Sequence, residues 1–148
     1  MSCNCNPRQI PAPNITPTLA AGSVASPYYV LVNITQRLCH KTCATEQPVF
    51  NARFSLVNFT RVGVNQFVAT VNVQGIISYV RCGGGCDCTE QQPLNANFTI
   101  PFGFTGTPTN VAIAQGATIN SMAANDCAKC SRLMVSETPI TLTVSATA

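Results

Sequence analysis

The chain has 148 residues and a mass of 15.6 kDa; 46% of its residues are hydrophobic and only 9% are charged. This length fits one domain with its own core, and this hydrophobic content excludes ordinary disorder. The net charge of +3 comes from scattered basic residues, which excludes the clustered basic footprint of a nucleic-acid-binding protein.

The first 27 residues are rich in proline and have no periodic apolar pattern. Proline lacks a backbone donor and biases the residue before it toward an extended conformation. We therefore predict an extended N-terminal connector arm over residues 1–27 and one domain over residues 28–148. The arm does not begin like a secretory signal, and no stretch of the chain is apolar enough for a membrane span.

From residue 28 onward, apolar and polar residues alternate with a period of two, most clearly over residues 94–104. Such alternation indicates strands with one buried and one solvated face. Several of these strands separated by Gly, Pro and Asn predict an all-β fold, a β-sandwich or jelly roll. Pro101 inside its strand predicts an edge strand or a bulge. The predicted strands cover residues 28–35, 50–56, 67–73, 94–104, 110–113 and 140–146. The expected core residues are Phe50, Phe54, Phe67, Val71, Phe98, Ile100, Leu142 and Val144.

The nine cysteines are too many for a typical cytosolic protein of this size, and their odd number excludes complete pairing within one chain. A thiol stays free, some bonds run between chains, or the thiols bind metal. Two of the cysteines, Cys3 and Cys5, lie in the arm. The seven in the domain are Cys39, Cys43, Cys82, Cys86, Cys88, Cys127 and Cys130.

These seven cysteines are expected at one end of the sandwich. If consecutive strands run antiparallel, the segments 36–48, 81–93 and 114–132 all lie at the same end, and the arm leaves from the other. An arm of 27 residues reaches about 80–90 Å when extended. Its Cys-x-Cys tip would then meet the cysteine-rich end of a neighbouring subunit. A head-to-tail contact of this kind generates an open filament unless the rotation between subunits closes a ring.

Three other functions need different residues. In a Cys-rich zinc-binding module the domain cysteines and the single His40 would supply four tetrahedral ligands, although only Cys127 and Cys130 have Cys-x-x-Cys spacing. An enzyme is not expected, because His40 is only adjacent to Cys39 in sequence and the five acidic residues are spread along the chain. A surface adhesin would need an aromatic cluster or polar pocket, and no such pattern is found. The metal-ligand candidates of the zinc alternative are Cys39, His40, Cys43, Cys82, Cys86, Cys88, Cys127 and Cys130.

The segment Met1-Ser2-Cys3-Asn4-Cys5-Asn6 ahead of one all-β domain resembles the subunits of endospore appendages of spore-forming bacteria. The resemblance covers the arm and the architecture. It implies a jelly-roll subunit whose Cys-bearing N-terminal connector bonds covalently to preceding subunits in resistant extracellular fibres. It also implies that Cys3 and Cys5 are connector cysteines, and that no signal peptide is needed because the subunits are made in the mother cell.

Together these features predict a non-enzymatic structural subunit. We expect it to assemble head to tail with copies of itself into a filament or layer on the cell or spore surface, without a cofactor. Disulfides through Cys3 and Cys5 would cross-link the subunits, and the domain cysteines would be acceptors or form bonds within the chain.

Overall fold

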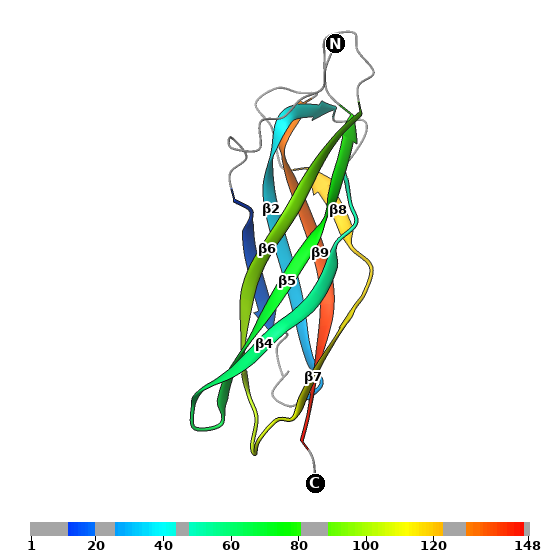
Figure 1. The fold of residues 1–148 in the computed structure, drawn as a ribbon. Helices are drawn as coiled ribbons and strands as arrows, with labels where there is room; N and C mark the ends of the chain where they lie inside the picture. Colours follow the sequence, from blue (N-terminus) through cyan, green and yellow to red (C-terminus); the bar gives the residue numbers. More distant parts are fainter. Residues whose placement is uncertain (1–11, 20–25, 44–47, 81–88, 123–129, 147–148) are drawn as a thin grey trace.

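Nine β-strands and no helix make up the part of the chain that the structure describes, which confirms the predicted all-β fold (Figure 1). The structure is a computed structural model that describes residues 12–19, 26–43, 48–80, 89–122 and 130–146. Of these, residues 39–43, 80, 89–90, 121–122 and 130–132 are described by their backbone alone. The strands are β1 (Asn14–Leu19), β2 (Tyr28–Cys43), β3 (Val49–Phe50), β4 (Arg53–Gly63), β5 (Gln66–Val80), β6 (Thr89–Gly103), β7 (Asn110–Gln115), β8 (Ile119–Met122) and β9 (Cys130–Ser145).

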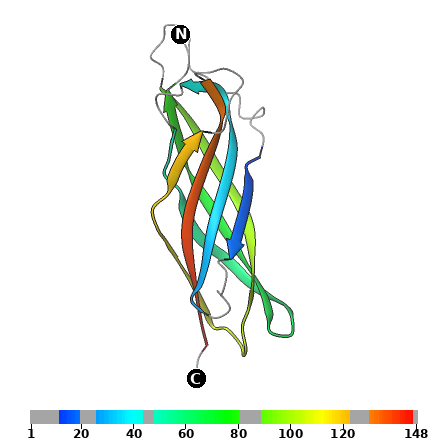
Figure 2. The same cartoon turned by 180° about the vertical axis from the view of Figure 1, so that it is seen from behind.

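The strands form two antiparallel sheets that pack face to face as an elongated sandwich (Figures 1 and 2). Sheet A has the order β1-β2-β9-β7, and β8 pairs with β9 beyond the end of β7. In sheet B, β5 is central, with β6 along one edge and β3 and β4 along the other. The predicted β-sandwich is therefore confirmed. Because β4, β5 and β6 are neighbours in chain order, sheet B is a meander, and this order gives no support to a jelly roll.

The core lies between the two sheets and is built from the inward residue of each alternating pair. On β5, for example, Ala69, Val71 and Val73 are fully buried. Phe54 and Phe98 meet edge to face with ring centroids 6.0 Å apart, which is a favourable geometry for aromatic pairs. All eight core residues predicted from the sequence are buried: Phe50, Phe54, Phe67, Val71, Phe98, Ile100, Leu142 and Val144.

Strand β6 is an edge strand within the described residues, because it pairs with β5 alone. The ladder between them runs without a shift from the Gln66–Gly103 pair to the Val80–Thr89 pair. Pro101 lies in this strand, which confirms the prediction that its strand is at an edge.

Residues 14–19, predicted as part of a free arm, instead form the edge strand β1 of sheet A. The strand pairs antiparallel with β2, from Asn14 opposite Thr35 to Leu19 opposite Val30. Ile15, Pro17 and Leu19 are half-buried, and Ile15 and Leu19 pack against the core, whereas Thr16 and Thr18 are exposed. This alternation was hidden in the sequence by Pro17, which an edge strand tolerates because it needs donors on one side only.

A second strand missing from the predictions is β8, which follows β7 after a three-residue break. The break lies opposite Pro139 of β9, whose carbonyl accepts a 2.8 Å hydrogen bond from the Gly116 amide. Proline has no N–H to continue the ladder at this point. A side chain at residue 116 would come within 2.9 Å of the Pro139 ring, so the close approach requires glycine.

The register of the strands defines the two ends of the sandwich. We call the end where β2 finishes and β9 begins the upper end, and the opposite end the lower end (Figure 1). The β4–β5 hairpin turns at the lower end through Val64 and Asn65, and Asn65 has a positive φ of 55°. Strand β9 finishes at the lower end, opposite the start of β7.

Candidate functional site

Cys39, Cys43 and Cys130 lie on strands, not in the loops where they were predicted. Cys39 and Cys43 belong to β2, and Cys130 is the first residue of β9. The strands are longer than predicted because their inward alternation continues through polar residues such as Gln36, which interrupt an apolar pattern in the sequence. His40 also lies on β2, within the shifted stretch of the ladder between Arg37 and Thr42.

The ladder between β2 and β9 ends at the upper end with Cys43 opposite Cys130. Below this pair, Thr42 is opposite Ser131, and the register then shifts before Arg37 pairs with Leu133. Two of the predicted cysteine candidates are thus brought to facing backbone positions by strands that are far apart in sequence.

The remaining cysteines lie outside the described residues. Cys82, Cys86 and Cys88 are in the segment 81–88 that joins β5 to β6, and Cys127 is in the segment 123–129 that joins β8 to β9. Val80 and Thr89 flank the first segment and are register partners at the upper end. Cys3 and Cys5 precede the first described residue.

The direction of β1 corrects the predicted path of the arm. Asn14, the first residue of β1, lies opposite Thr35 in the middle of β2, and the strand then runs toward the lower end. The chain therefore enters β1 from the side of the upper end, and only the residues before β1 remain as a candidate connector. The physical cause is the burial of Ile15 and Leu19 against the sandwich.

Beneath the upper end, two buried glutamines donate to the same backbone carbonyl, and one of them links the two sheets. Gln36 of β2 and Gln92 of β6 each donate from Nε2 to the Arg37 carbonyl at 3.0 Å. Both side chains are about 98% buried or more, so these bonds offset the cost of removing their amides from water. The bond from Gln92 ties sheet B to β2 at the point where the β2–β9 register shifts, and sequence reasoning missed it.

On one side of the sandwich, Gln115 of β7 makes a similar link. Its Nε2 donates to the Ala52 carbonyl at 2.7 Å, and its Oε1 accepts from the Phe54 amide at 2.9 Å. The amide side chain thus satisfies the backbone of sheet B where β4 begins. In the sequence, these glutamines can be recognised only as polar residues within or next to an alternating apolar pattern.

The lower end contains a cavity of about 580 Å³ lined by Ser26, Tyr28, Asn65, Gln66, Gly103, Phe104 and Thr105. The Tyr28 hydroxyl donates to the Gly103 carbonyl, and burial raises the pKa of the Tyr28 phenol. The Asn65 carbonyl accepts a 3.1 Å hydrogen bond from the Phe104 amide. The first bond ties β2 to the end of β6, and the second ties the β4–β5 hairpin to the segment after β6.

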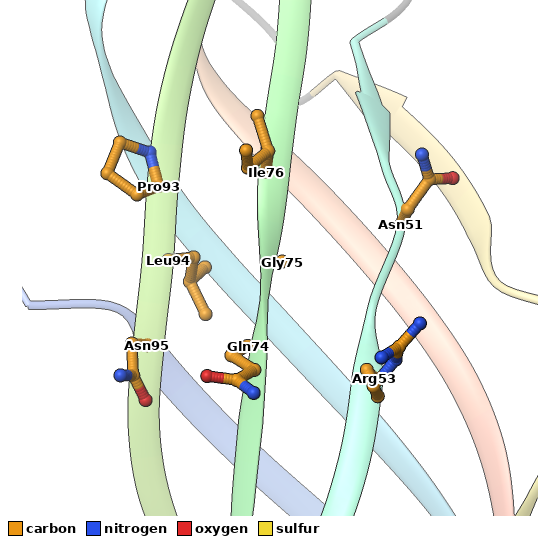
Figure 3. A pocket seen from close by; sticks show the side chains of 8 residues that line it. All are labelled: Asn51, Arg53, Gln74, Gly75, Ile76, Pro93, Leu94 and Asn95. Carbon is orange, nitrogen blue, oxygen red and sulfur yellow. The ribbon is translucent and has the colours of Figure 1, made fainter.

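A shallow groove of about 420 Å³ crosses the outer face of sheet B (Figure 3). Gly75 lies on its floor, and Figure 3 shows side chains of β6 along one side and Asn51 and Arg53 along the other. Ile76, in the groove, is 48% exposed. With one guanidinium, several amides and apolar surface, the groove is suited to packing and hydrogen bonding. Its lining is Asn51, Arg53, Gln74, Gly75, Ile76, Pro93, Leu94 and Asn95.

Within the described residues, no group of three or more His, Cys, Asp or Glu side chains is placed to hold a metal ion. The side chains of the zinc alternative lie outside that description, so that alternative stays a prediction. No helix in the described ranges is long and apolar enough to cross a membrane. Comparisons of the chain with protein-family models, curated proteins and solved structures find no significant match.

Proposed function

We propose that the chain is a structural subunit that self-assembles head to tail into an extracellular filament or surface layer, with disulfides through its N-terminal segment joining the subunits. The observation that carries the proposal is the distribution of the cysteines. Cys39, Cys43 and Cys130 lie at or near the upper end, and two more cysteines stand near the N-terminus. The resemblance to endospore-appendage subunits supports the same function.

The length of the N-terminal segment is compatible with a bond to the next subunit while β1 stays in place. Asn14 lies opposite Thr35, seven residues above Tyr28 at the start of β2, which corresponds to about 23 Å. Cys3 precedes Asn14 by eleven residues, which span about 36–40 Å when extended. In a head-to-tail stack the upper end of one subunit adjoins the lower end of the next. Cys3 can therefore reach the cysteine-bearing end of the subunit below.

The surface of the sandwich supports association between copies. Few charges oppose close approach, since only 9% of the residues are charged. At the β4–β5 hairpin, Val62 and Val64 are 61% and 81% exposed. Within the described residues β6 pairs with β5 alone, and an edge strand of this kind is prone to pair with other chains.

The direct test is gel electrophoresis of the assembled full-length chain, boiled in detergent with and without reductant. Covalent ladders that collapse to a 15.6 kDa band with reductant are expected. The double variant Cys3→Ser/Cys5→Ser should lose the ladders. The matched control Asn4→Ser/Asn6→Ser changes the same segment equally but keeps both thiols, and should retain them.

Two results would contradict the proposal. Ladders of wild-type length in the Cys3→Ser/Cys5→Ser variant would mean that the N-terminal thiols do not join subunits. A monomer in both lanes of the wild type, together with stoichiometric zinc by elemental analysis, would favour the metal-binding module instead.

A further inference from the structure

We propose that Cys43 and Cys130 form a disulfide within one chain, which closes the upper end of the β2–β9 ladder. The two residues are register partners in this antiparallel ladder, and Thr42 and Ser131 are the next pair below them. The inference does not depend on the proposed assembly, because both cysteines belong to the same subunit.

The backbone spacing is right for such a bond. Directly opposed residues of antiparallel strands have Cα atoms about 4.5 or 5.5 Å apart, depending on the type of pair. Disulfides need Cα atoms about 4.4–6.8 Å apart, so either type of pair lies within the permitted range. The other cysteine of β2, Cys39, falls in the shifted stretch between Arg37 and Thr42, which has no register partner on β9.

The position also explains what the bond would do. The ladder loses its regular register above Arg37, so only the two pairs at Thr42 and Cys43 hold β2 and β9 together at the upper end. A covalent link there prevents this short stretch from fraying.

The chemistry requires an oxidant, and a low-molecular-weight disulfide such as oxidised glutathione supplies it. One protein thiolate attacks the small disulfide and releases one small thiol; the second protein thiolate then attacks the mixed disulfide and releases the other. The protein loses two electrons and two protons, which leave with the two small thiols. Of the seven domain cysteines, five then remain for other bonds: Cys39, Cys82, Cys86, Cys88 and Cys127. This number is odd, so at least one of them is still available outside the chain.

The distribution of basic residues makes the pair easy to identify by peptide mapping. Trypsin cleavage after Lys41, Arg53, Lys129 and Arg132 places Cys43 alone in peptide 42–53 and Cys130 alone in peptide 130–132. The full-length chain is equilibrated with oxidised glutathione, remaining thiols are blocked with N-ethylmaleimide, and the digest is analysed by mass spectrometry without reduction. A linked species of peptides 42–53 and 130–132 that disappears on reduction is expected as the main form of both.

Matched variants sharpen the result. In Cys43→Ser, peptide 130–132 should become fully alkylated, whereas Cys39→Ser should leave the linked species at its wild-type level. Recovery of peptides 42–53 and 130–132 mainly as alkylated peptides in the wild type would overturn the proposal. The proposal would also be overturned if peptides 42–53 and 130–132 were linked mainly to peptide 1–8, 38–41 or 82–129 and not to each other. A link between peptide 1–8 and peptide 38–41 or 82–129 bears on the proposed joining of subunits and does not contradict the Cys43–Cys130 bond.

Discussion

Replacing Gly75 with alanine should destabilise the sandwich, although alanine is normally preferred to glycine inside a strand. A Cβ atom at this position would lie far inside contact distance of the Asn51 carbonyl oxygen and 2.8 Å from Cε1 of Phe50. The Phe50 side chain is 1% exposed and the Asn51 oxygen belongs to the backbone, so neither can move aside easily. The β3–β4 segment would therefore have to shift away from β5.

Overpacking of a core typically costs about 1–3 kcal/mol, and a clash with rigid backbone belongs at the upper limit, about 3 kcal/mol. For a chain of this size, that loss lowers Tm by roughly 6–12 °C. Thermal unfolding followed by far-UV circular dichroism is suitable, because the chain has no tryptophan. The control is Gly63→Ala, whose Cβ would meet only Gln66 at 3.5 Å and should be neutral or stabilising. Equal Tm values for Gly75→Ala, Gly63→Ala and the wild type would refute this packing argument.

Three further predictions concern polar side chains. Tyr28→Phe removes the bond to the Gly103 carbonyl and should cost about 1 kcal/mol. Because burial raises the pKa of Tyr28 above 10.0, the free energy of unfolding of the wild type should fall as the pH rises past 10 and through the folded-state pKa. In denaturation experiments over the same pH range, Tyr28→Phe should not show this part of the decrease. Gln115→Ala leaves two backbone partners without their bonds and should lower the urea midpoint by an amount equivalent to about 1 kcal/mol, whereas Gln74→Ala leaves both of these bonds in place and should not. Ser136 has a buried hydroxyl oxygen that finds no hydrogen-bond partner among the described residues, so Ser136→Ala should leave Tm unchanged or raise it, and a marked decrease would contradict that view.

The alternation of apolar residues was sufficient to predict the fold class and the core, because every second residue of a half-buried strand is apolar. It was insufficient for the ends of strands. Gln36 and Thr138 occupy inward positions, but each is hydrogen-bonded inside the sandwich, which no local pattern reveals. Strand β1 was missed because Pro17 masks its alternation. Strand β8 was missed because Pro139 of β9 interrupts the edge of sheet A, so that β7 and β8 pair with β9 as two separate strands.

The candidate site was predictable in part for a different reason. Chain direction alone places the ends of consecutive antiparallel strands, so Cys39, Cys43 and Cys130 were correctly assigned to one end although they lie on strands. Their pairing was not predictable. The facing positions of Cys43 and Cys130 depend on the register of two strands separated by most of the domain, and on a shift in that register.

The proposed cross-link makes a quantitative prediction about the N-terminal segment. With β1 in place, Cys3 must cover about 23 Å from Asn14 to reach the lower end of its own subunit. Deleting residues 10–11 leaves Cys3 nine positions before Asn14, about 30–32 Å, which is sufficient. Deleting residues 6–12 leaves Cys3 four positions before Asn14, about 13–14 Å. A disulfide adds at most about 7 Å between the two Cα atoms, so the total stays below about 23 Å and is too short.

The shorter deletion should therefore retain reductant-sensitive ladders, and the longer one should lose them while keeping both cysteines and all of β1. Since both deletions end before the first strand, their far-UV circular dichroism and Tm should match the wild type, so loss of ladders would not reflect unfolding. Wild-type ladders from the longer deletion would place the acceptor cysteine within about 21 Å of Asn14. Such an acceptor would belong to a subunit alongside, and the head-to-tail arrangement would have to be abandoned for a lateral one.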